Sequence, residues 1–243
     1  MIFELIGDLA KMALIVAGLY LALAAYVQRR RHTWAAPMAK RRFTILLGLV
    51  LMVSALKVGG DVLGGESGPV DRSILVFIHS HVPGAMMWFF EGVTVSGSAR
   101  VLFPLTAAGA IGLLYARRRF EALLLVGSVA GGELVVFLVK TAVGRARPDL
   151  WHTITYWGSS FPSGHTLVTA AFATATVLCV DRIRPAAHVF TLPVALVWII
   201  LVACSRLVLG VHWPTDVLAA ACIGAFLPLA VSVVLEFIRT HQN

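Results

Sequence analysis

Long apolar runs separated by short polar segments dominate the chain. Seven such runs occupy, approximately, residues 3–27, 43–58, 101–115, 120–139, 163–180, 189–209 and 216–238. A bilayer core about 30 Å thick is crossed by roughly 20 apolar residues in a helix, and these runs reach or approach that length. Strands of a membrane barrel would alternate apolar and polar residues, whereas these runs are continuously apolar. The pattern therefore predicts an all-α polytopic membrane protein with about seven transmembrane helices.

Composition agrees with this interpretation. Of the 243 residues, 59% are hydrophobic and only 13% are charged, and the mean hydropathy is +0.87. Soluble domains are about 45–50% apolar and about 25% charged, so a soluble globular enzyme and a disordered chain are both excluded. Each of the three cysteines, Cys179, Cys204 and Cys222, lies in an apolar run. We interpret them as small buried hydrophobic residues rather than as a disulfide framework or a zinc site.

The positive charges gather in alternate loops. If the N-terminus lies outside, the cytoplasmic segments are 28–42, 116–119, 181–188 and 239–243, and they hold 12 of the 20 lysines and arginines. Cytoplasmic loops of membrane proteins are enriched in these residues. The sequence thus predicts a multi-pass membrane protein with its N-terminus outside and its C-terminus in the cytoplasm. In a bacterium the membrane would be the inner membrane and the outside the periplasm. Topology then explains the net charge of +8, and nucleic-acid binding is not needed to explain it.

Two details complete the predicted topology. The first apolar run is followed, not preceded, by an arginine cluster and has no clear cleavage site, so it predicts a span rather than a signal peptide. The long loop at about 59–100 contains two apolar stretches too short to cross a membrane, one of which holds the aromatic residues 88–90. Aromatic residues are enriched at membrane interfaces, so we expect one or two short helices lying on the outer surface.

The remaining polar residues collect in two regions, both at the predicted outer face. One consists of residues 140–149 together with 161–165, and the other includes Ser205, Arg206, His212 and Asp216. Ionisable residues at membrane ends pair with each other, extend toward water or mark a functional site. So many of them in a chain that otherwise avoids charge indicate a functional site.

Five of these residues have the properties of an anion site. Ser163 and Gly164 directly precede an apolar run, where a starting helix offers free backbone N–H groups and a hydroxyl to an anion. Gly164 allows a ligand to approach the backbone closely. Arg147 and Arg206 can each grip two phosphoryl oxygens, and Lys140 adds a point charge. The expected ligand is a phosphoryl group.

Two histidines and an aspartate add the elements of nucleophilic catalysis. His212 and Asp216 are four residues apart and share one face if that segment is helical. Asp216 would then fix the tautomer of His212 and leave its other ring nitrogen free to attack. His165 remains as a general acid for the leaving group. Individual roles cannot be assigned to the residues expected at the rim, which are Arg145, Asp149, Trp151 and His152.

With this spacing, the polar residues resemble the three-part signature of the type 2 phosphatidic acid phosphatase superfamily. The three parts are Lys140 with Arg147-Pro148, Pro162-Ser163-Gly164-His165, and Ser205-Arg206 with His212 and Asp216. The resemblance covers about 43–238. It implies a six-helix membrane phosphatase domain at 43–243, preceded at 1–42 by an extra transmembrane helix and a basic cytoplasmic loop.

The resemblance also implies a role for each site residue. His212 would form a phosphohistidine, Asp216 would orient it, and His165 would protonate the leaving oxygen. The phosphoryl group would be held by Lys140, Arg147, Ser163, Gly164 and Arg206. No cofactor and no metal are implied, and the motifs contain no paired carboxylates of the kind that hold Mg²⁺.

The favoured function is a lipid phosphatase at the outer face, acting on a phospholipid or isoprenoid lipid phosphate. Undecaprenyl diphosphate is the preferred substrate, and the alternatives are phosphatidylglycerol phosphate, phosphatidic acid and lipid A phosphates. A lipid-to-lipid phosphotransferase would use the same residues. An anion transporter is disfavoured because its site would lie near the bilayer midplane, and a haloperoxidase because that class is soluble. The sequence does not indicate an oligomeric state.

Overall fold

Helices account for the regular structure of the chain. The computed structural model describes residues 2–31, 34–151 and 158–240, and in these ranges it contains helices and no strands, which confirms the all-α prediction. The α-helices are α1 (Ile2–Arg30), α2 (Ala35–Lys40), α3 (Arg42–Leu63), α4 (Gly68–His81), α5 (Met87–Ser96), α6 (Ala99–Tyr115), α7 (Arg119–Val143), α8 (Gly164–Ile183), α9 (His188–Val208) and α10 (Pro214–Thr240). Short 3₁₀ turns occur at Gly84–Met86 and Pro185–Ala187.

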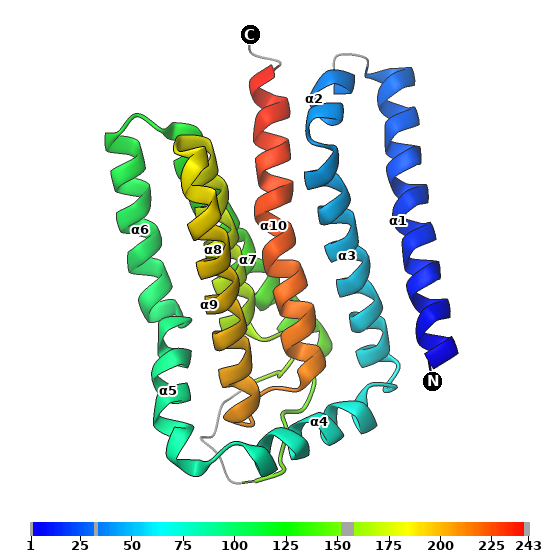
Figure 1. The fold of residues 1–243 in the computed structure, drawn as a ribbon, viewed down its shortest axis with the longest axis vertical. Helices are drawn as coiled ribbons and strands as arrows, with labels where there is room; N and C mark the ends of the chain where they lie inside the picture. The colour runs from blue at the N-terminus through cyan, green and yellow to red at the C-terminus, as the bar shows by residue number, and fades with distance from the viewer. Residues whose placement is uncertain (1, 32–33, 152–157, 241–243) are drawn as a thin grey trace.

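Six of the seven predicted spans are helices long and apolar enough to cross a membrane. They are α1, α3, α7, α8, α9 and α10, which run roughly side by side (Figure 1). The seventh, α6, has 17 residues and is shorter than a typical span. The chain is therefore a multi-pass membrane protein, but seven complete spans are not established.

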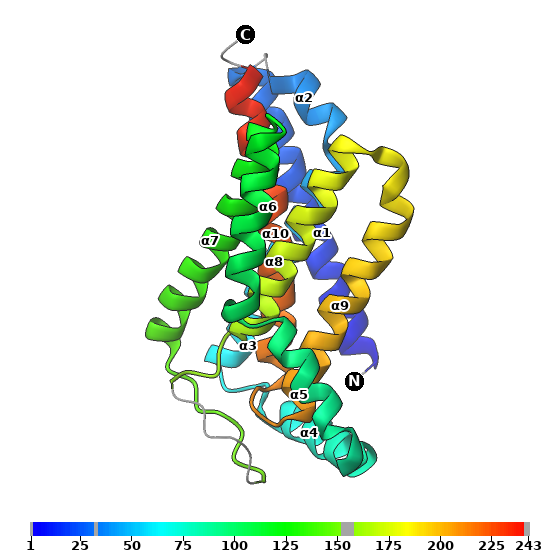
Figure 2. The same ribbon diagram turned by 90° about the vertical axis from the view of Figure 1, so that its left-hand side faces the viewer.

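Helix α5 differs from the prediction of short helices lying on the outer surface. Helix α4 does lie across the lower end of the bundle, but the chain then bends by 95° and α5 stands end to end with α6 (Figures 1 and 2). Helix α5 packs against α9, where the Trp198 indole donates a 2.9 Å hydrogen bond to Ser96 Oγ. At the α5–α6 junction, a Cβ on Gly97 would lie 2.7 Å from Thr169 Oγ1. Helix α5 therefore packs against α9 and does not lie flat across the end of the bundle as α4 does.

Helix α8 occupies the centre of the bundle and packs against α7, α9 and α10 (Figure 2). It is rich in alanine and threonine, and these small side chains allow its neighbours to approach closely. Its buried residues Leu167 and Val168 form a core cluster with Val129 of α7 and Ala220 of α10. The helix that begins with the Ser163-Gly164-His165 motif is therefore the one most surrounded by protein.

Buried and half-buried ion pairs join the helices at the end where the basic loops collect. The Arg182 guanidinium of α8 lies 2.6 Å from Glu236 of α10 and 3.4 Å from the buried Glu121 of α7. Glu236 also pairs with Arg41 beside α3. These contacts use part of the positive charge of this end to connect four helices.

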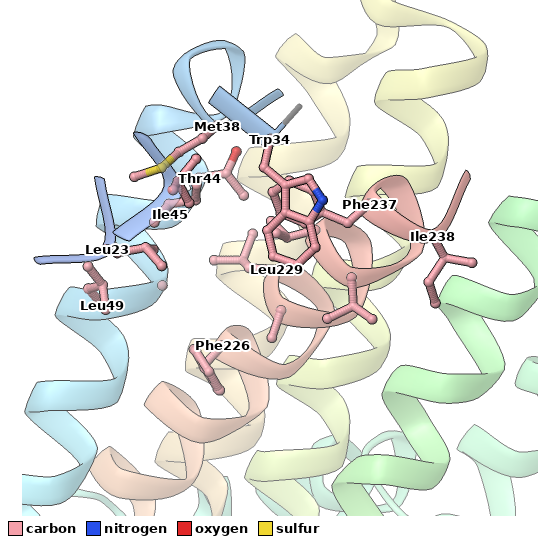
Figure 3. A pocket seen from close by; sticks show the side chains of 15 residues that line it. Leu23, Trp34, Met38, Thr44, Ile45, Leu49, Phe226, Leu229, Phe237 and Ile238 are labelled. Carbon is pink, nitrogen blue, oxygen red and sulfur yellow. The ribbon is translucent and has the colours of Figure 1, made fainter. Parts of the chain in front are cut away.

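The N-terminal helix packs mainly on α3, away from α8. Between α1, α2, α3 and α10 lies a cavity of about 460 Å³ with an almost wholly apolar lining (Figure 3). Trp34 and Phe237 meet at its upper end with ring centroids 4.7 Å apart. Many side chains of α1, including Leu14 and Leu21, are exposed, as expected for a helix in contact with lipid.

The close packing of α8 on α10 leads to a prediction about stability. A Cβ at Gly224 of α10 would lie 2.3 Å from the Leu167 carbonyl oxygen and 2.7 Å from Ala170 Cβ. We expect Gly224→Ala to force the two helices apart and lower the free energy of unfolding by about 1–3 kcal/mol. The midpoint of thermal unfolding in detergent would report this change.

Gly131 provides the matched control, because nothing lies within 4 Å of a Cβ built there. Gly131→Ala should preserve or slightly raise the thermal midpoint, since alanine favours a helix over glycine. Equal midpoints for the two variants would show that the α8–α10 contact is not tight.

Candidate active site

The predicted site residues meet at one end of the bundle. Helices α7 and α9 end there, and α8 and α10 begin there, on the side of the molecule opposite the basic loops (Figure 1). The N-terminus lies at the same end as the site (Figure 1). All eight predicted catalytic and phosphate-binding residues are carried by these four helix ends and the segments beside them.

His212 lies in the tight turn between α9 and α10. The turn depends on Gly210, whose φ is +64°, and a Cβ there would come within 2.6 Å of the Trp151 indole nitrogen. The His212 side chain is only 2% exposed. Its Nδ1 lies 3.5 Å from Oδ2 of the fully buried Asp216, which accepts a 2.9 Å hydrogen bond from the Trp213 backbone N–H. The predicted pairing of His212 with Asp216 is therefore present in the geometry.

The surroundings of His212 define its protonation state. Burial lowers its pKa to about 4, and the charges of Arg206 and Arg147 act in the same direction, whereas Asp216 opposes them. The ring is therefore neutral at neutral pH. Nε2 lies 3.5 Å from the Arg147 guanidinium, which can only donate, and Nδ1 faces a carboxylate, which can only accept. Both neighbours favour a proton on Nδ1 and a lone pair on Nε2, which is the form required of a nucleophile.

The start of α8 supplies the second part of the site. Ser163 is the N-cap residue and is fully buried, and Gly164 is the first helical residue. The Ser163 backbone N–H donates a 3.2 Å hydrogen bond to the Asp216 carbonyl oxygen, and its Oγ lies 3.1 Å from Thr166 Oγ1. The N-terminus of α8 is thus attached to the catalytic end of α10. Free N–H groups at a helix start bind anions.

The three predicted cations are held mainly by neutral oxygen atoms. Arg147 donates to the Val211 carbonyl at 2.9 Å, and Lys140 donates to the Ser159 carbonyl. Arg206 is 1% exposed and donates to Thr94 Oγ1 at 2.5 Å. Carbonyl and hydroxyl oxygens thus help to orient these side chains, whose positive charges can bind a phosphoryl group.

His165 is half-buried in the first turn of α8, within electrostatic reach of Arg206, Lys140 and Arg147. His212 acts on it as well, so the two histidines share one surrounding. The arrangement brings together His212, a second imidazole and several cations. Among the residues that the structure describes, no three His, Cys, Asp or Glu side chains gather as a metal site would require.

Several important residues lie outside the motifs predicted from sequence. Arg145, expected only at the rim, forms ion pairs with both Asp216 and Asp71. Asp71 lies in the segment predicted to be a long loop at about 59–100, but it is fully buried on α4. Thr94, which binds Arg206, had no sequence signal at all. His152, also expected at the rim, lies outside the described residues.

Comparisons with known proteins find a family match over the segment that holds these residues. The model of the PAP2 superfamily matches residues 121–239. The chain is 32% identical over 117 residues to a lipid A 1-phosphatase of Rhizobium johnstonii (44% of this chain and 45% of that one). It is 42% identical over 90 residues to phosphatidylglycerophosphatase B of Escherichia coli K12 (35% and 34%). The matches therefore span less than half of either relative.

A solved structure supports the fold. The transmembrane PAP2-type phosphatidylglycerolphosphate phosphatase of Bacillus subtilis superposes with a TM-score of 0.68 at 24% identity, covering 80% of this chain and 96% of that one. Members of the superfamily are phosphatases that act without a metal ion. Residues 121–239, which the family model matches, contain all eight predicted site residues. These findings show that residues 121–239 of the chain form a PAP2 superfamily domain.

Proposed function

We propose that the protein is a membrane lipid phosphatase that works through a phosphohistidine on His212. One observation carries the proposal: Nε2 of a buried, neutral histidine faces the guanidinium of Arg147 beside a helix N-terminus. The multi-pass fold makes a lipid the natural bearer of the phosphate. The related proteins named lipid A 1-phosphatase and phosphatidylglycerophosphatase B support that choice.

In the first step, the lone pair on Nε2 of His212 forms a bond to phosphorus while the bond from phosphorus to the leaving oxygen breaks. His165 gives its proton to that oxygen. The phosphorylated imidazole keeps its Nδ1 proton and carries positive charge, which the buried carboxylate of Asp216 stabilises. Arg147, Arg206, Lys140 and the start of α8 hold the phosphoryl oxygens.

In the second step, water attacks phosphorus and the bond to Nε2 breaks. His165, now without its proton, accepts one from the water, so free phosphate leaves and the enzyme returns to its starting state. A lipid hydroxyl in place of water would make the protein a phosphotransferase, and the site residues would be the same. Product analysis separates the two, because the hydrolase releases free phosphate.

For the substrate we propose a lipid diphosphate, with undecaprenyl diphosphate preferred. Phosphatidylglycerol phosphate, phosphatidic acid and lipid A phosphates are the alternatives, and the names of the relatives favour the first and the last of these. We further propose that the site faces the periplasm and the basic loops face the cytoplasm. The separation of the two at opposite ends of the bundle supports this orientation (Figure 1).

The first prediction concerns the nucleophile. His212→Ala should lower turnover at least about 10³-fold, because it removes the proposed nucleophile and with it the covalent intermediate. Asp216→Asn should cost about 10²–10⁴-fold, because it leaves the ring in place but removes the charge that orients it. Phosphohistidine hydrolyses in acid. The intermediate is therefore measured with ³²P-labelled lipid after an alkaline quench. His188→Ala, at the opposite end of the bundle, is the matched control, and its loss of turnover would point to general damage.

The second prediction tests His165 and the substrate class together. A lipid monophosphate expels a strongly basic alkoxide, whereas a diphosphate expels a much less basic phosphate monoester. General acid catalysis contributes about 10²–10⁴-fold, so His165→Ala should lose close to that factor on a monophosphate and far less on a diphosphate. Initial rates on both substrates measure this, and the wild-type enzyme should turn over the diphosphate faster. Equal fractional losses would leave His165 as a phosphate ligand only.

The third prediction concerns orientation. In a variant without the three native cysteines, Asp149→Cys near the site and Tyr115→Cys at the other end are both exposed positions. A membrane-impermeant maleimide added to spheroplasts should label the first and spare the second until the membrane is opened. The reverse pattern would place the site in the cytoplasm.

A further inference from the structure

A fully buried carboxylate outside the family motifs lies close to the catalytic pair. Asp71 belongs to α4, the helix that crosses the lower end of the bundle (Figure 1). Its Oδ2 accepts hydrogen bonds from the Arg145 guanidinium and from Thr215 Oγ1, both at 2.7 Å. Its Oδ1 accepts a 3.0 Å bond from the Thr215 backbone N–H. Asp71 therefore caps the start of α10 from another helix, one residue before Asp216.

Arg145 links this carboxylate to the catalytic one. One end of its guanidinium lies 2.7 Å from Asp71 Oδ2, and the other lies 2.6 Å from Asp216 Oδ1. The same two nitrogens donate to Ser67 Oγ at 3.1 Å and to Thr215 Oγ1 at 2.9 Å. The planar guanidinium is thereby fixed between two side chains that are each fully buried.

The backbone of Arg145 is held as firmly as its side chain. Its N–H donates to Ser159 Oγ at 3.0 Å, and its carbonyl accepts from the Ser160 N–H at 2.8 Å. The guanidinium also lies over the Trp213 ring, 5.6 Å from the centroid. Arg145 thus has one available position, and the position of the Asp216 carboxylate follows from it.

This arrangement divides the work between the two oxygens of Asp216. Arg145 binds Oδ1, so Oδ2 is left to accept the Trp213 N–H and to face Nδ1 of His212. A carboxylate turns easily about its terminal torsion, so without Arg145 the Asp216 carboxylate would lose the ion pair that fixes its Oδ1. Without Asp71, Arg145 would lose the second carboxylate, which aligns the other end of its guanidinium.

We propose that Asp71 and Arg145 are positioning residues, which act through Asp216 to keep the proton of His212 on Nδ1 and the lone pair on Nε2. The expected effect on catalysis rests on the proposed function. The expected effect on the His212 tautomer is independent of it. Helix α4, which contributes no residue to the motifs, becomes part of the machinery that prepares the nucleophile.

The test compares Asp71→Asn, Arg145→Gln and the double variant with wild-type protein in detergent. Histidine-selective ¹⁵N NMR at neutral pH, assigned with His212→Ala, reports which ring nitrogen carries the proton. Wild-type His212 should show a protonated Nδ1 and an unprotonated Nε2, and both single variants should show a mixture. Asp61→Asn, which removes a carboxylate paired with Lys57 on α3, is the matched control and should resemble wild type.

The second readout is kinetic. Asp71→Asn should slow phosphohistidine formation about tenfold or more while the KM changes less than about twofold, because the network touches Asp216 rather than the phosphate ligands. If the two residues form one unit, the double variant should be no slower than Arg145→Gln alone. A purely structural role would lower the thermal midpoint and leave the tautomer and the rate per folded molecule unchanged, which would overturn the proposal.

Two further outcomes are distinguished. If wild-type protein forms no phosphohistidine but its tautomer still depends on Asp71, the proposed function fails and the positioning role stands. If Asp71→Asn does not fold, Arg145→Gln carries the test alone, since it removes the guanidinium that joins Asp71 to Asp216. This variant should also show a mixed tautomer, and a wild-type spectrum from it would overturn the proposal.

Discussion

The contact between the first turns of α8 and α10 is the constraint on which the site depends. Each helix begins with a catalytic motif, and the Ser163 N–H bonds directly to the Asp216 carbonyl at 3.2 Å. Farther along, Gly224 of α10 allows the two helices to approach too closely for any side chain. Backbone packing therefore holds His212, the proposed nucleophile, and the N-terminus of α8, the proposed anion site, at a fixed separation.

Around this contact the cations are sorted by the kind of oxygen that holds them. Arg145 lies between two carboxylates, so its charge is balanced within the protein and its role is to fix geometry. Arg147 and Lys140 are bound by backbone carbonyls, and Arg206 by a threonine hydroxyl. The dipoles of these oxygens help to orient the cations, and cations oriented in advance suit a ligand rich in negative charge.

The opposite end of the bundle uses charge differently. Glu121 and Glu236 bind Arg182, which connects α7, α8 and α10 away from the site. Most of the other cations there lie in short loops, where they match the charge bias of a cytoplasmic face. Helix α1 adds a lipid-exposed surface and borders an apolar cavity (Figure 3), and its contacts lie away from the catalytic residues.

The sequence by itself determined the helical membrane fold and the eight motif residues. Few structures can span a bilayer, so a continuous apolar run already implies a helix. The residue types and spacing of the motifs predict a phosphate-binding site. Only the tertiary structure decided that α5 stands against α9 and that Asp71 is buried against Arg145, which is 74 residues away. The local sequence pattern around Asp71 cannot show that this aspartate pairs with an arginine in a distant part of the chain. That pairing depends on how the helices pack. Burying the Asp71 carboxylate costs less free energy once the Arg145 guanidinium lies beside it.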